Sequence, residues 1–169
     1  MHRIKIGDIA PNFSFGGQHE KIKELENLKG KIVVLFFVRS LFWRQCRTGT
    51  SEFGRTADKF RAENAEILIV VPEEREKAVK YASEMGFGGF VVPDNEKKIY
   101  HRYGLDTSLM GAMQKSEVFV IDAAGEVAFA QGHGSPLRLP KVTEVLNVVK
   151  SLNTKSASEK WLAHSPEMK

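Results

Sequence analysis

Two uninterrupted apolar runs, residues 32–38 and 67–71, are the features that most constrain the fold of this chain. A run without polar alternation is typical of a strand that is covered on both faces of a sheet. Between the runs, side chains recur at steps of four and three, which places them on one face of a helix. This face consists of Cys46, Thr50, Phe53, Ala57 and Phe60. Strand, helix and strand in this order predict a parallel βαβ unit within an α/β fold.

The remaining segments predict a single domain built around that unit, with a mixed β-sheet flanked by helices. The helix after the first run is expected to end near Asn64, and the last helix near Leu152. The other expected elements are an N-terminal β-hairpin over residues 12–23, a helical turn over 24–30, a helix opened by Pro72, a strand at 90–92, a helix over 95–103, a hairpin over 118–130 and a helix from 139. We therefore expect one domain over residues 1–152 and a mobile C-terminal tail over residues 153–169.

Composition argues against several classes of function. A chain of 169 residues can build one hydrophobic core, and a net charge of +4 without basic runs interleaved with aromatic residues does not predict nucleic-acid binding. No apolar run approaches a membrane span, and the N-terminus lacks the apolar core of a signal peptide. One cysteine cannot form an internal disulfide, and no cluster has metal-ligand spacing. These features predict a cytoplasmic protein that binds neither nucleic acid nor membrane and has no metal site.

The one cysteine, Cys46, lies near the start of the helix that follows the first apolar run, and two interpretations fit it. As the first member of the helical stripe, it resembles a small buried core residue. A thiol reacts as its thiolate, however, and a helix N-terminus with cations nearby favours the thiolate. Arg39, Arg44 and Arg47 would supply those cations, so the same position also suits a reactive cysteine.

Four short motifs resemble, in order and spacing, the alkyl hydroperoxide reductase / thiol-specific antioxidant (AhpC/TSA) family of peroxiredoxins. They are G-x-x-A-P-x-F at 7–13, L-x-G-K at 28–31 before the apolar strand, P-D…Y-G at 93–104 and F-x-I-D-x-x-G at 119–125. The resemblance covers about residues 3–152 and implies a thioredoxin fold. It also implies that Cys46, at the position of the family's peroxidatic cysteine, attacks a peroxide as the thiolate and is restored by a thiol.

The segment before Cys46 departs from the family's usual P-x-x-x-T-x-x-C motif. Arg39 stands in the proline position and Trp43 in the threonine position, where an indole can donate one hydrogen bond and accept none. Ser116 stands where the family usually has an arginine. A second pattern, F-x-R-x-x-x-C-x-x-C-R of peroxiredoxin-like proteins outside the main classes, fits the segment better, with Trp43 in place of its first cysteine. Either pattern implies that Cys46 needs a partner thiol from outside the chain.

Three functions remain consistent with these residues. The first is a thiol-dependent peroxidase that uses one cysteine and no cofactor to reduce hydrogen peroxide or organic hydroperoxides. Its expected catalytic residues are Cys46, Arg47, Arg39 and Trp43. Its partners would be the peroxide and an external thiol reductant, either thioredoxin-like or small, and a homodimer is compatible with the resemblance. The other two functions are thiol–disulfide exchange and binding of a partner by a degenerate thioredoxin fold without turnover.

Overall fold

The computed structural model describes residues 3–16, 21–42, 44–86, 88–107, 114–132 and 139–164. Within them the strands form a two-stranded sheet near the N-terminus and a central five-stranded sheet. The elements are β1 (Ser14–Phe15), β2 (Lys23–Glu24), the 3₁₀ helix η1 (Leu25–Leu28), β3 (Ile32–Phe37), α1 (Arg44–Arg55), α2 (Ala57–Ala62), β4 (Ala65–Val71), α3 (Arg75–Met85), β5 (Phe90–Pro93), α4 (Lys98–Arg102), β6 (Glu117–Ile121), β7 (Val127–Gln131) and α5 (Val142–His164).

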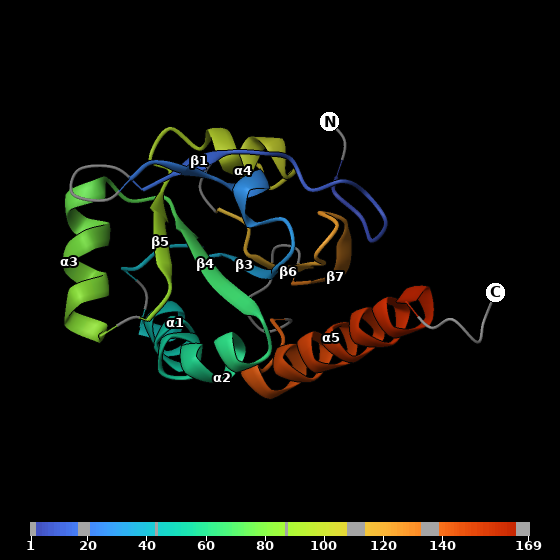
Figure 1. Cartoon of the computed structure of the whole chain (residues 1–169). Helices are drawn as coiled ribbons and strands as arrows, with labels where there is room; N and C mark the ends of the chain where they lie inside the picture. Colours follow the sequence, from blue (N-terminus) through green and yellow to red (C-terminus); the bar gives the residue numbers. More distant parts are fainter. Residues whose placement is uncertain are drawn as a thin grey trace.

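The central sheet is mixed and has the strand order β5-β4-β3-β6-β7 (Figure 1). Strands β3, β4 and β5 are parallel, whereas β6 runs antiparallel to β3 and β7 antiparallel to β6. Every residue of the central strand β3 is buried, as its uninterrupted apolar run predicts. The predicted mixed sheet with flanking helices and an N-terminal β-hairpin is confirmed.

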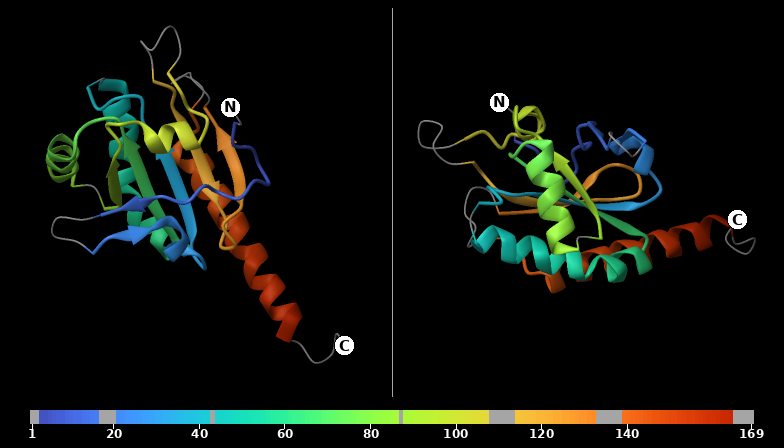
Figure 2. Two further views of the ribbon diagram at one scale, coloured as in Figure 1. Left: turned by 90° about the horizontal axis from the view of Figure 1, so that it is seen from above. Right: turned by 90° about the vertical axis from the view of Figure 1, so that its left-hand side faces the viewer.

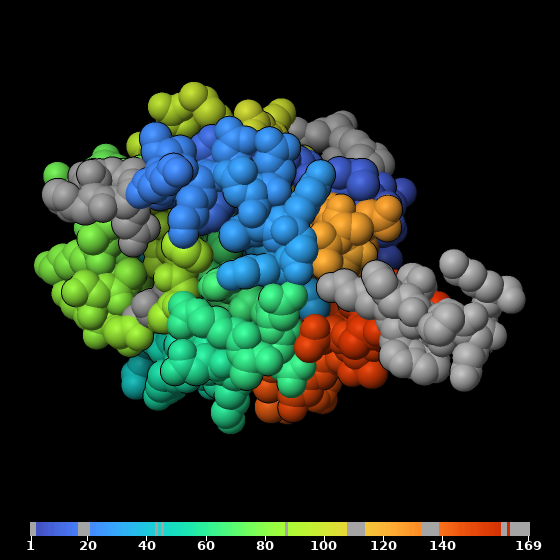
Figure 3. Space-filling model, viewed as in Figure 1, coloured from blue at the N-terminus to red at the C-terminus, as the bar shows by residue number. Residues whose placement is uncertain are grey.

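Two layers cover the two faces of this sheet, and alternating side chains of β3 reach both. Helices α1, α2 and α5 lie on one face, while the N-terminal strands and α4 lie on the other (Figures 1 and 2). Phe36 packs into the core under the first layer with Phe53 and Phe60. Its neighbour Phe37 packs into the opposite core with Tyr100. The space-filling view shows the N-terminal segment in blue next to the orange turn between β6 and β7, a contact that includes a Gly30 amide bond to a carbonyl of that turn (Figure 3).

The helix after β3 is interrupted, which the sequence pattern does not predict. Helix α1 ends at Arg55, and α2 begins at Ala57 with nearly the same direction (Figure 2). Thr56 lies at the break. Its Oγ1 lies 2.8 Å from the Glu52 carbonyl oxygen and 3.1 Å from the Phe53 carbonyl oxygen, and the hydroxyl can donate to either. Such bonds from a threonine side chain to the preceding turn bend helices. The break leaves the predicted buried face intact, because Phe53 and Ala57 on either side remain in one core.

The last helix extends well beyond its predicted end. Helix α5 continues past Leu152 to His164, so the predicted end of the helix near Leu152 is wrong. Neither glycine nor proline occurs between Leu152 and Pro166, so nothing in that stretch stops the helix. In Figure 1 the end of α5 projects past the edge of the sheet. The division into a domain over 1–152 and a segment over 153–169 stays a prediction.

Candidate active site

Cys46 is the third residue of α1, in the first turn after the loop that leaves β3, as predicted. Its side chain faces the sheet in the same apolar cluster as Val38 and Leu41, and the residue is 8% exposed. The first turn of a helix presents unpaired amides, which stabilise negative charge. Burial fits the core interpretation, and position at the helix start fits the reactive one, so the neighbouring groups decide what the thiol can do.

The first neighbouring group is a pair of hydroxyls that joins α1 to α3. Thr50 Oγ1 lies 3.0 Å from both the Cys46 and the Arg47 carbonyl oxygens and can donate to either. The Tyr81 hydroxyl, from α3, lies 3.0 Å from Thr50 Oγ1 and 3.2 Å from the Arg47 carbonyl, to which it donates. Burial raises the pKa of Tyr81, and negative charge on Cys46 would raise it further, so the hydroxyl is a neutral donor at neutral pH. The first turn of α1 is thereby fixed against α3.

Tyr100, from α4, holds the carboxyl ends of β3 and β4 together. Its hydroxyl lies within hydrogen-bond distance of the carbonyls of Val38 and Val70, and its side chain is completely buried. Burial raises the pKa of Tyr100 well above its usual value, and the negative charges of Glu73, of an aspartate and of a Cys46 thiolate add to that effect. Glu73 and Cys46 therefore both lie within electrostatic range of this one neutral hydroxyl.

Glu73 clamps the loop between β3 and α1. Its Oε1 accepts hydrogen bonds from the Ser40 hydroxyl and from the Leu41 amide, each at 2.8 Å. Its Oε2 is buried and has no hydrogen-bond partner among the described residues. Pro72 does not open the next helix as predicted, because α3 begins only at Arg75, and Glu73 lies in the loop before it. One feature of the sequence could have predicted this contact of Glu73. Parallel strands end at the same edge of a sheet, so the residue two places after β4 lies next to the loop after β3.

The predicted arginines divide into one that is half-buried and two that are exposed. Arg39 donates from Nε to the Gln114 carbonyl at 3.3 Å, across the entrance to β6. Arg44 and Arg47 are exposed on the first turn of α1. The positive charge of Arg47 lowers the pKa of Tyr81, the hydroxyl that Cys46 affects in the opposite sense, so Arg47 and Cys46 act on one site. Trp43, the fourth predicted residue, lies outside the described residues.

Ser116 lies on the same face of the sheet as Cys46. In the β3–β6 pairing Glu117 lies opposite Phe37, so the alternation of side chains turns Ser116 toward the layer that holds α1. Ser116 is 1% exposed, and its hydroxyl has no hydrogen-bond partner among the described residues. Glu117, which sequence reasoning missed, pairs with Arg3 at 3.3 Å on the other face. Burial raises the pKa of Glu117, and the Arg3 charge opposes the rise.

The described residues contain no group of three or more His, Cys, Asp or Glu side chains that could hold a metal ion. Helices long and apolar enough to cross a membrane are likewise absent from the part of the chain that the structure describes. The groups available for chemistry near Cys46 are therefore a thiol, hydroxyls, a carboxylate and guanidinium groups.

Comparison with known proteins places these features in a family. Residues 6–130 match the model of the AhpC/TSA family, which confirms the resemblance noted in the sequence. Chloroplastic peroxiredoxin Q of Triticum aestivum is 23% identical over 127 residues, which cover 75% of this chain and 58% of that protein. Peroxiredoxin Bcp of Bacillus subtilis is 29% identical over 96 residues, covering 57% of this chain and 61% of that protein. The chain thus spans about three fifths of the length of these curated relatives.

The fold has close counterparts among solved structures. The peroxiredoxin-like protein from Aquifex aeolicus superposes with a TM-score of 0.77 at 23% sequence identity, over 90% of each chain. The predicted thioredoxin fold is therefore confirmed.

Proposed function

Because the chain belongs to the AhpC/TSA family, we propose that it is a thiol-dependent peroxidase with Cys46 as its nucleophile. The observation that carries the proposal is the place of Cys46, in the first turn of α1, the helix that follows the carboxyl end of the central strand after a short loop. Amides of a helix start lie there to donate to negative charge that develops in the reaction, and the surrounding side chains exclude most water. With 8% of the residue exposed, the substrates would be hydrogen peroxide and small organic hydroperoxides.

The reaction needs one thiol from this chain and two from outside it. The Cys46 thiolate attacks the terminal peroxide oxygen, so that an S–O bond forms as the O–O bond breaks. The sulfur is oxidised to a sulfenic acid, and the peroxide, taking up a proton, is reduced to water or an alcohol. An external thiol then displaces water to give a mixed disulfide, and a second thiol releases Cys46. An external reductant is required because the sequence contains no other cysteine.

We assign supporting roles to the other predicted residues. Arg47, which acts on the same tyrosine hydroxyl as Cys46, would stabilise the thiolate electrostatically. Arg39 would hold the approach to β6 through its bond to the Gln114 carbonyl. The indole N–H of Trp43 would replace the threonine hydroxyl as a donor to the peroxide oxygen. With Ser116 instead of an arginine, fewer donors face the developing charge, and we expect slower turnover than in a site with the full motif.

A cytoplasmic location and a homodimer complete the proposal. A lone thiol that must return to its reduced form suits a reducing compartment such as the cytosol. Two copies could join through Cys46 when peroxide is in excess and the reductant is absent.

The test measures consumption of hydrogen peroxide by the full chain with dithiothreitol as reductant. We expect turnover in the wild type and at least about a hundredfold loss in Cys46→Ser, because no other group can form the sulfenic acid. Thr48→Ala changes an exposed residue of the same helix and should keep the wild-type rate. Turnover that persists in Cys46→Ser would exclude the mechanism.

A second candidate, binding of a partner without turnover, is favoured by one observation. Among the described residues the Ser116 hydroxyl has no hydrogen-bond partner, and it lies on the Cys46 face where the family usually has an arginine. If the wild type neither consumes peroxide nor yields a dimedone-trapped sulfenic acid, this candidate replaces the first. Formation of a mixed disulfide with oxidised glutathione, without peroxide consumption, would instead identify thiol–disulfide exchange.

A further inference from the structure

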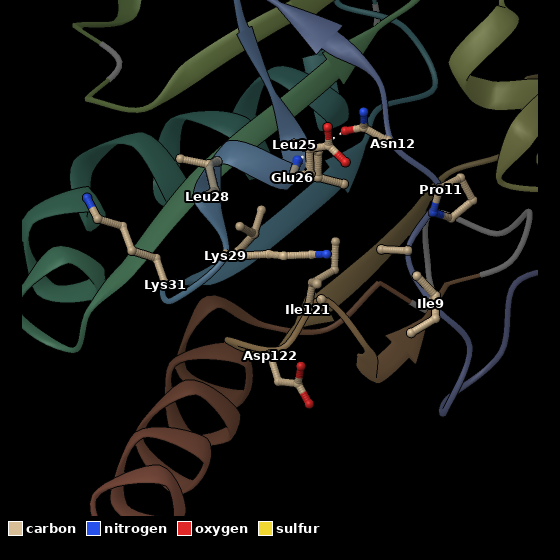
Figure 4. Close-up of a pocket in the computed structure, with 13 residues that line it drawn as sticks. Ile9, Pro11, Asn12, Leu25, Glu26, Leu28, Lys29, Lys31, Ile121 and Asp122 are labelled. Carbon is tan, nitrogen blue, oxygen red and sulfur yellow. Dashed lines mark hydrogen bonds between the residues drawn. The ribbon is translucent and has the colours of Figure 1, made fainter. Parts of the chain in front are cut away.

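A cavity of about 260 Å³ lies at the amino end of β3, the end opposite to Cys46 (Figure 4). Its apolar walls come from the N-terminal segment, η1, β3 and the end of β6. They are formed by Ile9, Pro11, Leu25, Leu28, Val33 and Ile121. Six strand residues alone separate the two ends of β3 by roughly 20 Å, so no ligand of ordinary size reaches both. The cavity is a site distinct from the thiol.

Lys29 is the charged group that points into this cavity. In Figure 4 its side chain extends between Leu25 and Ile121 toward the N-terminal segment. Its methylene stem runs across Gly125, where an added Cβ would come within 3.3 Å of Lys29 Cε. Glycine at this turn therefore leaves the path of the lysine open. No carboxylate of the described residues lies within ion-pair distance of its ammonium group.

Two of the other charged groups around the cavity, Lys31 and Asp122, are engaged elsewhere. Lys31 extends away from the cavity in Figure 4 and pairs with Glu66 at 3.6 Å. Asp122 Oδ1 accepts hydrogen bonds from the amides of Ala124 (3.0 Å) and Glu126 (2.9 Å), within its own turn. The cavity therefore offers apolar walls and the positive charge of Lys29, which pairs directly with no carboxylate of the described residues.

We propose that this cavity binds a small monocarboxylate with an apolar body. The apolar walls would bury the body, and the Lys29 ammonium would pair with the carboxylate. Carboxylates of Glu26 and Asp122 also line the cavity, and because repulsion grows with charge they would disfavour a dianion such as a phosphate monoester more than a monocarboxylate. The volume lies just below the usual range for ligand pockets, about 300–1,000 Å³, which suits a body of one aromatic ring or a short alkyl chain.

The test titrates the reduced full chain with sodium octanoate, below its micelle concentration, and follows backbone amide signals by NMR. We expect saturable shifts at residues 9–12, 25–31 and 121–125. Lys29→Met should weaken octanoate binding at least about tenfold, the loss of one charge-assisted contact. Lys31→Met removes a neighbouring charge that faces away and should leave the affinity unchanged.

Two further ligands separate charge recognition from apolar burial alone. 1-Octanol should bind at least about tenfold more weakly than octanoate to the wild type, and equally to wild type and Lys29→Met. Octyl phosphate should also bind more weakly than octanoate. The proposal fails if octanoate gives no saturable shifts at these residues, if Lys29→Met binds it as the wild type does, or if octyl phosphate binds more tightly. Since none of these measurements involves Cys46, they stand whether or not the protein is a peroxidase.

Discussion

The two ends of β3 differ in whether the polar side chains around them are held by hydrogen bonds. At the carboxyl end, Tyr100 and the Oε1 atom of Glu73 are hydrogen-bonded to the strand ends and loop that surround the buried Cys46. At the amino end, Lys29 extends beside an apolar cavity, and no carboxylate of the described residues lies within ion-pair distance of it. Charge that develops in a reaction is stabilised by fixed groups in a site that excludes water, whereas binding needs free volume and a free charge. One strand thus supports a reactive site at its carboxyl end and a binding cavity at its amino end, and the loops at each end determine the difference.

The largest expected difference concerns access to the thiol. Because Cys46 is 8% exposed, a bulky fluorescent maleimide should label the native chain at least about a hundredfold more slowly than the urea-unfolded chain. Rates followed by mass spectrometry measure this ratio. The matched control is Glu52→Cys in a Cys46→Ser background, which presents an exposed thiol on the same helix and should label at similar rates folded and unfolded. Rapid native labelling of Cys46 would contradict the closed site.

The next effect tests whether the Glu73 hydrogen bonds at the carboxyl end of β3 also stabilise the fold. Glu73→Ala removes the acceptor of two hydrogen bonds to a carboxylate and should lower the free energy of unfolding by about 2–3 kcal/mol. Glu74→Ala, at an exposed neighbour without a side-chain capping bond, should change it by less than about 0.5 kcal/mol. Lys29→Met, at the amino end of β3, should change the free energy of unfolding as little as Glu74→Ala does. Urea unfolding measures the free energy of unfolding of all three variants. Equal losses in Glu73→Ala and Glu74→Ala would show that the Glu73 hydrogen bonds do not stabilise the loop.

A smaller effect concerns the buried carboxyl of Glu117 and its pH dependence. Burial raises the pKa of Glu117, so the native state binds more protons than the unfolded state. Stability contributed by this group is therefore present at low pH and is lost as pH rises from the ordinary value of 4.5 through the native pKa. Glu117→Gln cannot titrate, so its stability relative to the wild type should increase over that interval. Urea midpoints at a series of pH values measure the trend.

The control for this trend is Asp58→Asn, which changes an exposed carboxylate that also pairs with an arginine. Its stability relative to the wild type should vary less with pH. A Glu117→Gln difference that stays constant with pH would show that the carboxyl does not titrate during unfolding.

The smallest effect is expected from removing residues 153–169, which lie beyond the predicted domain. In the described part of this segment the bond from Asn153 Nδ2 to Glu63 Oε2, at 3.1 Å, would be lost, which costs about 1 kcal/mol. The extension lines a cavity together with Ile32, at the amino end of β3 and away from Cys46, so peroxide turnover should be unchanged. A chain ending at Leu152 that is insoluble or inactive would show that the segment belongs to the domain.

Local pattern predicted most of the fold and the position of Cys46. The apolar runs place β3 and β4, and the stripe from Cys46 to Phe60 places the helices between them. The sequence pattern does not predict the break at Thr56, because the break arises from a hydrogen bond of one side chain to the carbonyl of the preceding turn. The apolar periodicity does not predict the length of α5, because residues 153–160 are mostly polar and carry no apolar stripe.

The partners of the site residues could not be predicted in the same way. Glu73 meets Ser40 and Leu41 across more than thirty residues of sequence, and Arg39 meets the Gln114 carbonyl across 75. Sequence distance alone predicts that Arg39, Arg44 and Arg47 surround the thiol. In the structure Arg44 and Arg47 are exposed, and the half-buried Arg39 donates to a backbone carbonyl.

The sequence by itself determined the α/β architecture, the family and the place of the one thiol at the start of a helix, because each depends on local spacing or on short motifs. Only the tertiary structure decided that a carboxylate and two tyrosines face the region of Cys46, that Ser116 shares its side of the sheet, and that Lys29 ends in a cavity. Those facts depend on strand order, register and loop packing, which bring together residues that are distant along the chain.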